Sequence, residues 1–307
     1  MDPMRISLST PTYNERENLT LLAEEIFAIV GAEPDIDLEL IVVDDGSSDG
    51  SADVVASLKD SRVRVLKSGF EGIATALNIG VKAATAPFIG RMDVDDIASP
   101  YRLEWQVDAL RRGQADIVGS RVRIVDLEGN AVASMQRYER WINDHCTWQD
   151  ISGLRFVESP LVHPSVTARR EVFELGYRNG HFPEDYDLWL RITAALPTLH
   201  IAEPLVKKYG GHSDQLSRSR WGMDRYRIQS LEKLLAAKTL TTMQERQALE
   251  ELTRKIDIYL TGARRRQRQN EIAIYACKEI FYRRLLASSS FLVTTEAVRT
   301  EEAKMCV

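Results

Sequence analysis

Two carboxylates separated by one residue, Asp93 and Asp95, follow the short apolar stretch 88–92, which has the pattern of a buried strand. In an extended backbone, side chains at positions i and i+2 point to the same side. Two hard oxygen donors side by side suit Mg²⁺ or Mn²⁺ that is shared with the phosphates of a substrate. Asp is also common in turns and at helix caps, so this pair alone does not separate a metal site from a turn.

A second acidic run, Asp44–Gly50, follows the apolar stretch 38–43 and contains three aspartates. A carboxylate at a strand end can accept hydrogen bonds from a base N–H or a ribose hydroxyl. We expect Asp49 to cap the helix that follows. Asp44 and Asp45 are not needed for that cap, so a binding role remains open for both.

These acidic runs lie within a regular alternation of strand and helix patterns over residues 1–112. Strands are expected at residues 6–9, 38–43, 62–66 and 88–92, and helices at residues 18–30, 49–60, 72–84 and 99–112. The alternation predicts an α/β fold with a mostly parallel central sheet flanked by helices. Ligands of such sheets bind at the carboxyl ends of the strands. The polar clusters that fall there are Thr10–Glu15, Asp44–Ser48 and Asp93–Asp96.

Glu184 and Asp185 follow Pro183 at the predicted start of a further helix. Acidic side chains in a first helical turn are stabilised by the helix dipole, so this pair alone has a structural explanation. A carboxylate placed opposite a leaving group could instead deprotonate an attacking hydroxyl. Both interpretations stay open on the residues of this helix alone.

Four motifs together resemble family 2 glycosyltransferases, the bacterial-type inverting enzymes with the GT-A (nucleotide-diphospho-sugar transferase) fold. In chain order they are Leu8–Glu15, Asp44–Gly50, Asp93–Asp96 and Glu184–Leu190. The resemblance covers residues 5–215 and implies a nucleotide-sugar donor, Mn²⁺ or Mg²⁺ as cofactor, and inversion at the anomeric carbon. It also implies a GT-A catalytic domain at 1–219 with a C-terminal helical extension at 220–307. Within that domain, 1–115 would be the nucleotide-sugar half and 116–219 the acceptor half.

The resemblance also implies roles for individual residues. The donor would be held by Pro11, Tyr13, Glu15, Asp44, Asp45 and Asp93, with Asp44 or Asp45 at the base or ribose. Asp95 would bind the metal and the diphosphate, and His212 would complete the metal shell or touch the diphosphate; a packing role for this loop histidine is the alternative. Asp185 would be the general base, with Glu184 beside it.

Two positions depart from the family pattern. Arg91-Met92 stands where the family often has only apolar residues, and Leu77-Asn78 stands where an Arg-Asn pair is common. The protein cation that would meet the diphosphate is therefore left open, with Arg91 and Lys82 as candidates.

The net charge of −5 is unevenly distributed, because residues 220–285 hold 15 basic and 8 acidic side chains. The acidic remainder argues against a general nucleic-acid binder. The basic part is open to an anionic membrane, an RNA or an acidic partner, or is a solvated helix face. Its leucines recur at helical spacing and need a partner surface, either the catalytic body or a second copy in a homo-oligomer. We expect Ala263–Arg268 to be exposed, because its arginines are too dense in like charge to bury.

The expected function is transfer of a sugar from a nucleotide-diphosphate sugar, with UDP favoured, to a hydroxyl acceptor. The acceptor context is surface polysaccharide or lipid-linked glycan synthesis. We expect a cytoplasmic protein, with a peripheral place at the inner face of the membrane. Three scattered cysteines fit a reducing compartment, and no apolar run approaches the roughly 18 residues of a membrane span.

Two other functions compete with this one. A sugar-nucleotide nucleotidyltransferase would need a Gly-rich, basic phosphate loop near the first strand, and Thr10–Glu15 contains none. A non-catalytic scaffold that binds a partner through its basic tail predicts loss of the carboxylates, and all four acidic motifs are intact.

Overall fold

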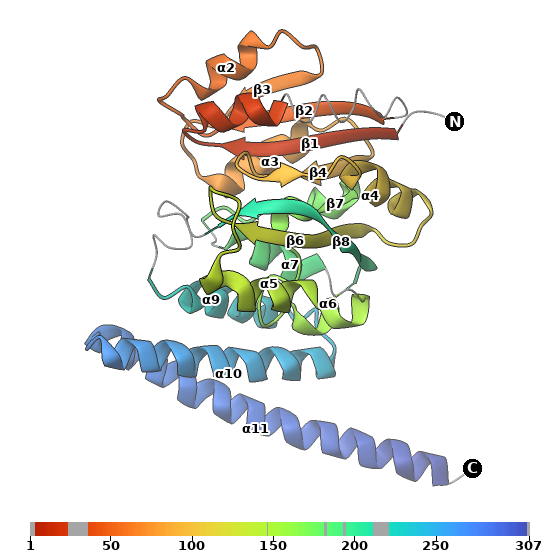
Figure 1. The fold of residues 1–307 in the computed structure, drawn as a ribbon. Helices are drawn as coiled ribbons and strands as arrows, with labels where there is room; N and C mark the ends of the chain where they lie inside the picture. The colour runs from red at the N-terminus through yellow and green to blue at the C-terminus, as the bar shows by residue number, and fades with distance from the viewer. Residues whose placement is uncertain are drawn as a thin grey trace. The chain divides into compact units, whose positions relative to one another are not determined.

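The computed structural model describes residues 4–23, 36–145, 147–180, 183–192, 195–210 and 221–305, with the side chains of 289–305 excepted. The chain divides into two compact units, Met1–Gln215 and Leu216–Val307. The first contains the sheet, and the second is helical (Figure 1). Across the described parts of the chain, no helix combines the length and apolar content needed to cross a bilayer.

The strand and helix alternation predicted for the N-terminal part is confirmed. Its elements are β1 (Met4–Thr12), a helix that begins at residue 16, β2 (Ile36–Asp44), α2 (Ser51–Ser57), β3 (Val63–Lys67), α3 (Ile73–Ala83), β4 (Phe88–Arg91), β5 (Ile97–Ala98) and α4 (Arg102–Arg111). The rest of the first unit contains β6 (Ile117–Val125), α5 (Gln136–Asn143), α6 (Trp148–Leu154), β7 (Thr167–Arg169), α7 (Glu184–Ile192) and β8 (Thr198–Tyr209), with short 3₁₀ turns before and after β7.

The eight strands form one sheet in the order β3-β2-β1-β4-β7-β6-β8-β5. Strands β1, β2, β3 and β4 run parallel to one another, and β6 is parallel to β8. The predicted mostly parallel sheet is thus confirmed, with two local reversals. The three-residue strand β7 runs antiparallel to both β4 and β6, and the two-residue strand β5 runs antiparallel to β8. Because β7 is reversed, the 3₁₀ turn that precedes it, His163–Ser165, lies at the carboxyl end of β4.

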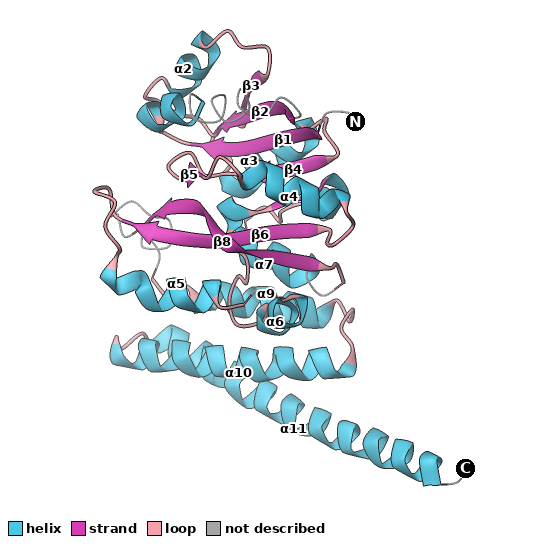
Figure 2. Ribbon diagram, turned by 45° about the vertical axis from the view of Figure 1, so that its right-hand side comes forward, coloured by secondary structure: helices cyan, strands magenta, loops and turns pink. Residues whose placement is uncertain are grey.

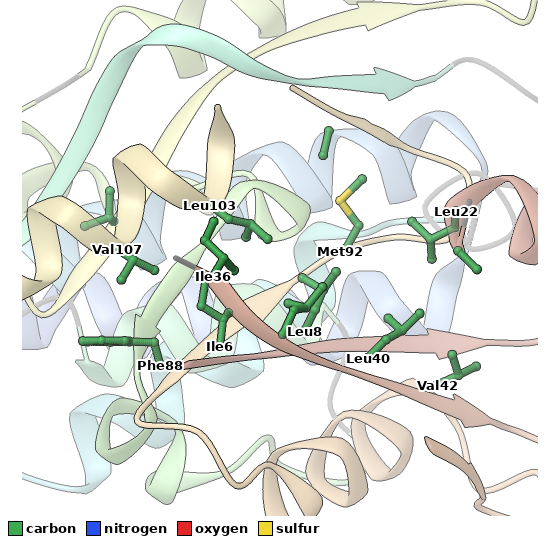
Figure 3. Close-up of a cluster of buried hydrophobic side chains, with 14 of the residues drawn as sticks. Ile6, Leu8, Leu22, Ile36, Leu40, Val42, Phe88, Met92, Leu103 and Val107 are labelled. Atoms are coloured by element: carbon green, nitrogen blue, oxygen red, sulfur yellow. The ribbon is translucent and has the colours of Figure 1, made fainter. Parts of the chain in front are cut away.

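Alternating residues of the central strands fill two apolar layers, one on each face of the sheet. Figure 2 shows the strands of the sheet and the helices around them. Leu40 and Val42 point to the layer covered by α4 and the helix that begins at residue 16. Leu22 lies on their side of this cluster, and Leu103 and Val107 belong to its other end, near Ile36 (Figure 3). Ile41 and Val43 point to the opposite layer, which is covered by α3 and α7. Both faces are buried, as a parallel α/β sheet requires.

The second unit consists of α9 (Asp224–Ala236), α10 (Thr242–Arg265) and α11 (Gln269–Met305), and α10 packs against both others. A capping box between Thr241 and Gln244 fixes the start of α10. Of the side chains expected to need a partner surface, Leu235 is half-buried and the others are buried, namely Leu231, Leu234, Leu249, Leu252, Ile256 and Leu260. Residues 264–268 are exposed as predicted, whereas Ala263 is buried because it belongs to the packed face of α10. The Arg268 guanidinium lies 4.1 Å from the ring centroid of Trp221.

Candidate active site

The carboxyl ends of β1, β2, β4 and β8 meet at one edge of the sheet, because these strands all run in the same direction. The polar segments that follow them therefore lie at that edge. β7 adds the His163–Ser165 turn to the same place, since its reversed direction brings its first residue beside Gly90. This edge gathers the groups that the sequence predicted for a binding site.

The carboxylate cluster is built by a turn. β4 ends at Arg91, and the N–H of Asp96 then lies 3.5 Å from the carbonyl oxygen of Asp93. Carboxylate oxygens of Asp93, Asp95 and Asp96 all lie within 4.8 Å of one another. The expectation that an extended backbone orients Asp93 and Asp95 is wrong, because the strand has already ended. The turn still brings these two carboxylates together, and it adds Asp96 to them.

Two cations flank Asp93. Arg91 is buried and forms an ion pair with Asp93. Lys208, near the end of β8, places its Nζ 3.1 Å from Asp93 Oδ2 and 3.3 Å from Asp96 Oδ2. Burial alone would raise the pKa of Asp93, but the charges of Arg91 and Lys208 outweigh it and hold that pKa well below its usual range. Asp93 is therefore an ionised carboxylate between two positive charges.

The first turn of α7 contains three acids with different surroundings. Asp187 is buried and paired with Arg178 and Arg191, each at 3.1 Å, so its carboxylate is committed to the fold. Glu184 is buried, and burial followed by the charge of Asp185 raises its pKa to about 8. Glu184 is then protonated at neutral pH. Asp185 is only half-buried, with one oxygen accepting from the Tyr186 N–H at 2.7 Å.

The apolar side of this helix packs into the first unit, because Tyr186, Leu188, Trp189 and Ile192 are all buried. The charges of Arg91 and Asp93 act on Glu184, so the start of α7 is electrostatically linked to the end of β4. The same charges of Arg91 and Asp93 also act on His163. Its Nε2 is 2.8 Å from the Tyr177 hydroxyl, and burial together with the Arg91 charge lowers its pKa and keeps the ring neutral.

The segment after β1 is attached to the segment after β2 by hydrogen bonds. The N–H groups of Asn14, Glu15 and Arg16 donate to side-chain oxygens of Ser47, Ser51 and Asp49, respectively. Asn14 adopts a left-handed backbone conformation, with φ of 56°. These bonds hold the Tyr13 ring outward and 48% exposed. Gly50 is the N-cap residue of α2, and the Asp49 carboxylate beside it accepts from the N–H of Ser51, the first residue of the helix, at 2.9 Å. Asp49 thus bonds to the start of α2 as expected and also joins the two segments through Arg16.

Asp44 and Asp45 are both buried but differ in what they bind. Asp45 accepts hydrogen bonds from the Ser68 hydroxyl and from the N–H groups of Glu71 and Gly72, so its carboxylate shapes the loop 68–72. Asp44 accepts one bond of 3.1 Å, from the Ser47 N–H. Of the pair, Asp44 retains more acceptor capacity for a ligand.

The loop that Asp45 shapes presents an aromatic ring that the sequence reasoning missed. Phe70 is 69% exposed, has a left-handed φ of 65°, and its ring centroid lies 5.3 Å from that of Tyr13. Gly46 permits this arrangement, because a Cβ there would lie 3.1 Å from that of Phe70 and its own φ is 84°. The available sequence signal was a phenylalanine at a loop position beside Gly69, which is unusual for an apolar residue.

The remaining predicted residues have mixed outcomes. His212 lies outside the described residues. Lys82 is in the last turn of α3, which leads to the amino end of β4, so it is at the opposite edge of the sheet from the carboxylate cluster. Lys208 was missed, because nothing in the sequence marks one lysine of the Lys207-Lys208 pair as the partner of an aspartate 115 residues away.

A mixed sheet with helices on both faces and an acidic cluster at the carboxyl edge is the arrangement of GT-A glycosyltransferases, and comparison with solved structures agrees. S. aureus TarS 1–349 in complex with UDP-GlcNAc superimposes with a TM-score of 0.70 at 15% identity, covering 91% of this chain and 81% of TarS. The mannosyltransferase PcManGT of Pyrobaculum calidifontis, in complex with GDP-Man and Mn²⁺, has a TM-score of 0.55 at 16% identity, covering 97% and 87%. At these identities the likeness establishes the fold.

The family follows from sequence. The model of glycosyl transferase family 2 matches residues 7–176, more than half of the chain, so this protein belongs to glycosyltransferase family 2. The O-antigen biosynthesis glycosyltransferase WbnJ of Escherichia coli is 26% identical over 67% of this chain and 80% of its own length. The amylovoran biosynthesis glycosyltransferase AmsE of Erwinia amylovora is 28% identical over 65% and 75%. The protein is therefore a glycosyltransferase, and the predicted family is confirmed.

Proposed function

We propose that this glycosyltransferase moves a sugar from a nucleotide-diphosphate sugar, with UDP as the favoured nucleotide, to a hydroxyl group of a glycan or lipid-linked acceptor. Surface polysaccharide synthesis is the favoured context, supported by the similarity to an O-antigen and an amylovoran enzyme. The observation that carries the proposal is the carboxylate cluster Asp93–Asp96, which shares the carboxyl edge of the sheet with the exposed Tyr13 ring. Membrane contact and self-association through residues 220–285 stay predictions.

The donor atoms of the cluster fit a divalent cation. Three carboxylates offer the hard oxygen ligands that Mg²⁺ and Mn²⁺ prefer. Few protein carboxylates are needed when phosphate oxygens of the substrate complete the coordination shell of the ion. We assign the metal to Asp95, with Asp93 and Asp96 beside it and His212 as a further expected ligand. Once bound, such an ion stabilises the negative charge of the leaving diphosphate. PcManGT, which shares the fold, was crystallised with GDP-Man and Mn²⁺.

Asp185 is the proposed general base of a direct, inverting displacement. It would accept the proton of the acceptor hydroxyl as that oxygen attacks the anomeric carbon. Its neighbours support this choice, because Asp187 is held by two arginines and the raised pKa of Glu184 keeps that carboxyl protonated. A protonated Glu184 can donate a hydrogen bond but cannot take the proton. The transfer would then proceed without a covalent enzyme intermediate.

The nucleotide end of the donor is assigned to Tyr13, Phe70 and Asp44, with Pro11 and Glu15 in the same segment as Tyr13. Two exposed rings 5.3 Å apart offer faces for a base, and the Asp44 carboxylate can accept from the base or the ribose. Asp45 contributes indirectly, because it fixes the loop that holds Phe70.

Replacement of Phe70 by Ala is expected to weaken UDP binding about 5- to 100-fold, since base–aromatic stacking contributes about 1–3 kcal/mol. Isothermal titration calorimetry with UDP and Mn²⁺ measures this change directly. The exposed ring contributes little to the core, so the melting temperature should stay close to that of the wild type. Phe70→Tyr retains the aromatic face and should bind like the wild type. Unchanged affinity of Phe70→Ala would remove Phe70 from the donor site.

The reaction class is tested by incubating the purified protein with UDP-, GDP- and dTDP-sugars, with and without Mn²⁺. We expect one nucleotide series to raise the melting temperature only when Mn²⁺ is present, and turnover to release a nucleoside diphosphate. Formation of sugar 1-phosphate and nucleoside triphosphate from added pyrophosphate would instead identify a nucleotidyltransferase. No stabilisation by any nucleotide sugar, with or without Mn²⁺, would favour the non-catalytic scaffold.

A further inference from the structure

Lys208 is a positive charge placed inside the predicted metal site. Its Nζ contacts one carboxylate oxygen of Asp93 and one of Asp96, at 3.1 and 3.3 Å. The next residue, Tyr209, donates its N–H to the other oxygen of Asp96 at 3.0 Å. The end of β8 is thus bound to the 93–96 turn through two of its three carboxylates. The Lys208 side chain is 23% exposed, so the ammonium lies at the rim of the cluster.

The charges of the cluster are already largely balanced by the protein. Asp93, Asp95 and Asp96 place three carboxyl groups within 4.8 Å of one another, and Arg91 and Lys208 place two positive charges beside them. Arg91 is buried and reaches only Asp93 among these acids, whereas Lys208 bridges two of them. Lys208 therefore links two carboxylates of the 93–96 turn, as a bound metal ion would.

An ammonium and a divalent ion would compete for these oxygens. Magnesium lies about 2.0–2.1 Å from its oxygen ligands, so an ion bound to the oxygens that Lys208 contacts would be close to Nζ. Two cations that close repel each other in a partly buried site. Binding of the metal to Asp93 or Asp96 would therefore favour an outward movement of Lys208.

We propose that Lys208 is a built-in counter-cation of the carboxylate cluster, which holds Asp93 and Asp96 when no metal is bound and competes with the metal for them. This inference rests on the metal site of the proposed function. Once displaced, the ammonium gains a new anionic partner if a diphosphate is present at the cluster. Nucleotide binding then offsets the cost of moving Lys208, so metal and nucleoside diphosphate bind with positive coupling.

The test measures binding of Mn²⁺ alone, and then of Mn²⁺ with UDP, by electron paramagnetic resonance of the free ion. Wild-type protein should bind Mn²⁺ weakly alone and more tightly with UDP. Lys208→Met should bind Mn²⁺ alone about tenfold more tightly, because a competing charge next to the ion is gone. Its affinity for Mn²⁺ should also gain less from UDP. Lys208→Gln keeps a donor for the carboxylates without the charge and should behave in the same way.

Lys207→Met is the matched control, because Lys207 is the adjacent exposed lysine on the same strand. It should leave both Mn²⁺ affinities unchanged. If neither Lys208 variant binds Mn²⁺ more tightly than the wild type, while Asp95→Ala still loses the ion, Lys208 is only a structural tie and the inference is wrong with the proposed function intact. If the wild type and every variant fail to bind Mn²⁺ even with UDP, the metal site itself is refuted.

Discussion

Asp185→Asn is expected to lower the rate of sugar transfer by about 10²- to 10⁴-fold, the usual size of a general-base contribution. Its affinity for the nucleotide sugar should stay the same. An amide has nearly the shape of the carboxylate but cannot take the proton of the acceptor. It can still accept the hydrogen bond of 2.7 Å from the Tyr186 N–H, so the start of α7 should be preserved. Donor binding and chemistry should therefore separate in this variant.

The measurement is steady-state transfer at saturating donor, together with calorimetric affinity for UDP and Mn²⁺. Glu184→Gln is the matched control, because Glu184 is adjacent and its pKa of about 8 keeps it protonated at pH 7. A glutamine resembles that neutral acid, so Glu184→Gln should retain most of the transfer activity. If Glu184→Gln loses transfer and Asp185→Asn retains it, the two roles are reversed. Asp187 is an unsuitable base in either case, since two arginines hold it.

The placement of the acidic runs at one edge was predictable from local patterns. Each run follows an apolar stretch of strand length, and a parallel sheet brings the carboxyl ends of its strands to a common edge. The positions of Asp44 and Asp93 could therefore be predicted once the strands before them and the parallel direction of those strands were known. The alternation of strands and helices indicates both. The family motifs added the chemical roles that the pattern alone left open.

The details of the site depend on contacts between distant residues. Asp95 approaches Asp93 because β4 ends at Arg91, the last residue that pairs with β1, and a turn follows. Lys208 reaches the cluster only because β8 runs parallel to β6 and ends at the same edge. No local pattern contains this information, since the topology of the second half of the sheet decides it.

Asp45 shows the same limit in the nucleotide half. The sequence offers Asp44 and Asp45 as equivalent ligands, and the loop 68–72 distinguishes them by occupying the Asp45 carboxylate with three donors. Phe70 depends on that loop and on the close approach permitted by Gly46. An exposed ring with a left-handed backbone is energetically unfavourable in isolation, so its presence points to a role in binding.

Asp95→Ala is expected to abolish Mn²⁺-dependent donor binding while leaving the fold intact. Asp95 is half-buried within a turn at the sheet edge, so its carboxylate contributes charge to the cluster rather than packing to the core. Its loss leaves Asp93 and Asp96, and Lys208 contacts one oxygen of each. The remaining acids are thus already paired with a protein cation. We expect the affinity for Mn²⁺ to fall by more than about tenfold, because one negative charge next to the ion is lost.

The melting temperature with and without UDP and Mn²⁺ reports this change. Wild-type protein should be stabilised by the pair of ligands, and Asp95→Ala should melt at the same temperature in their presence and absence. Asp108→Ala serves as the control, because Asp108 forms only an exposed ion pair with Arg112 on α4 and such pairs contribute little. Normal turnover of Asp95→Ala with Mn²⁺ would show that the metal is held elsewhere. In that case Asp93 and Asp96 would be partners of Arg91 and Lys208 rather than metal ligands, and the diphosphate would be met by protein cations.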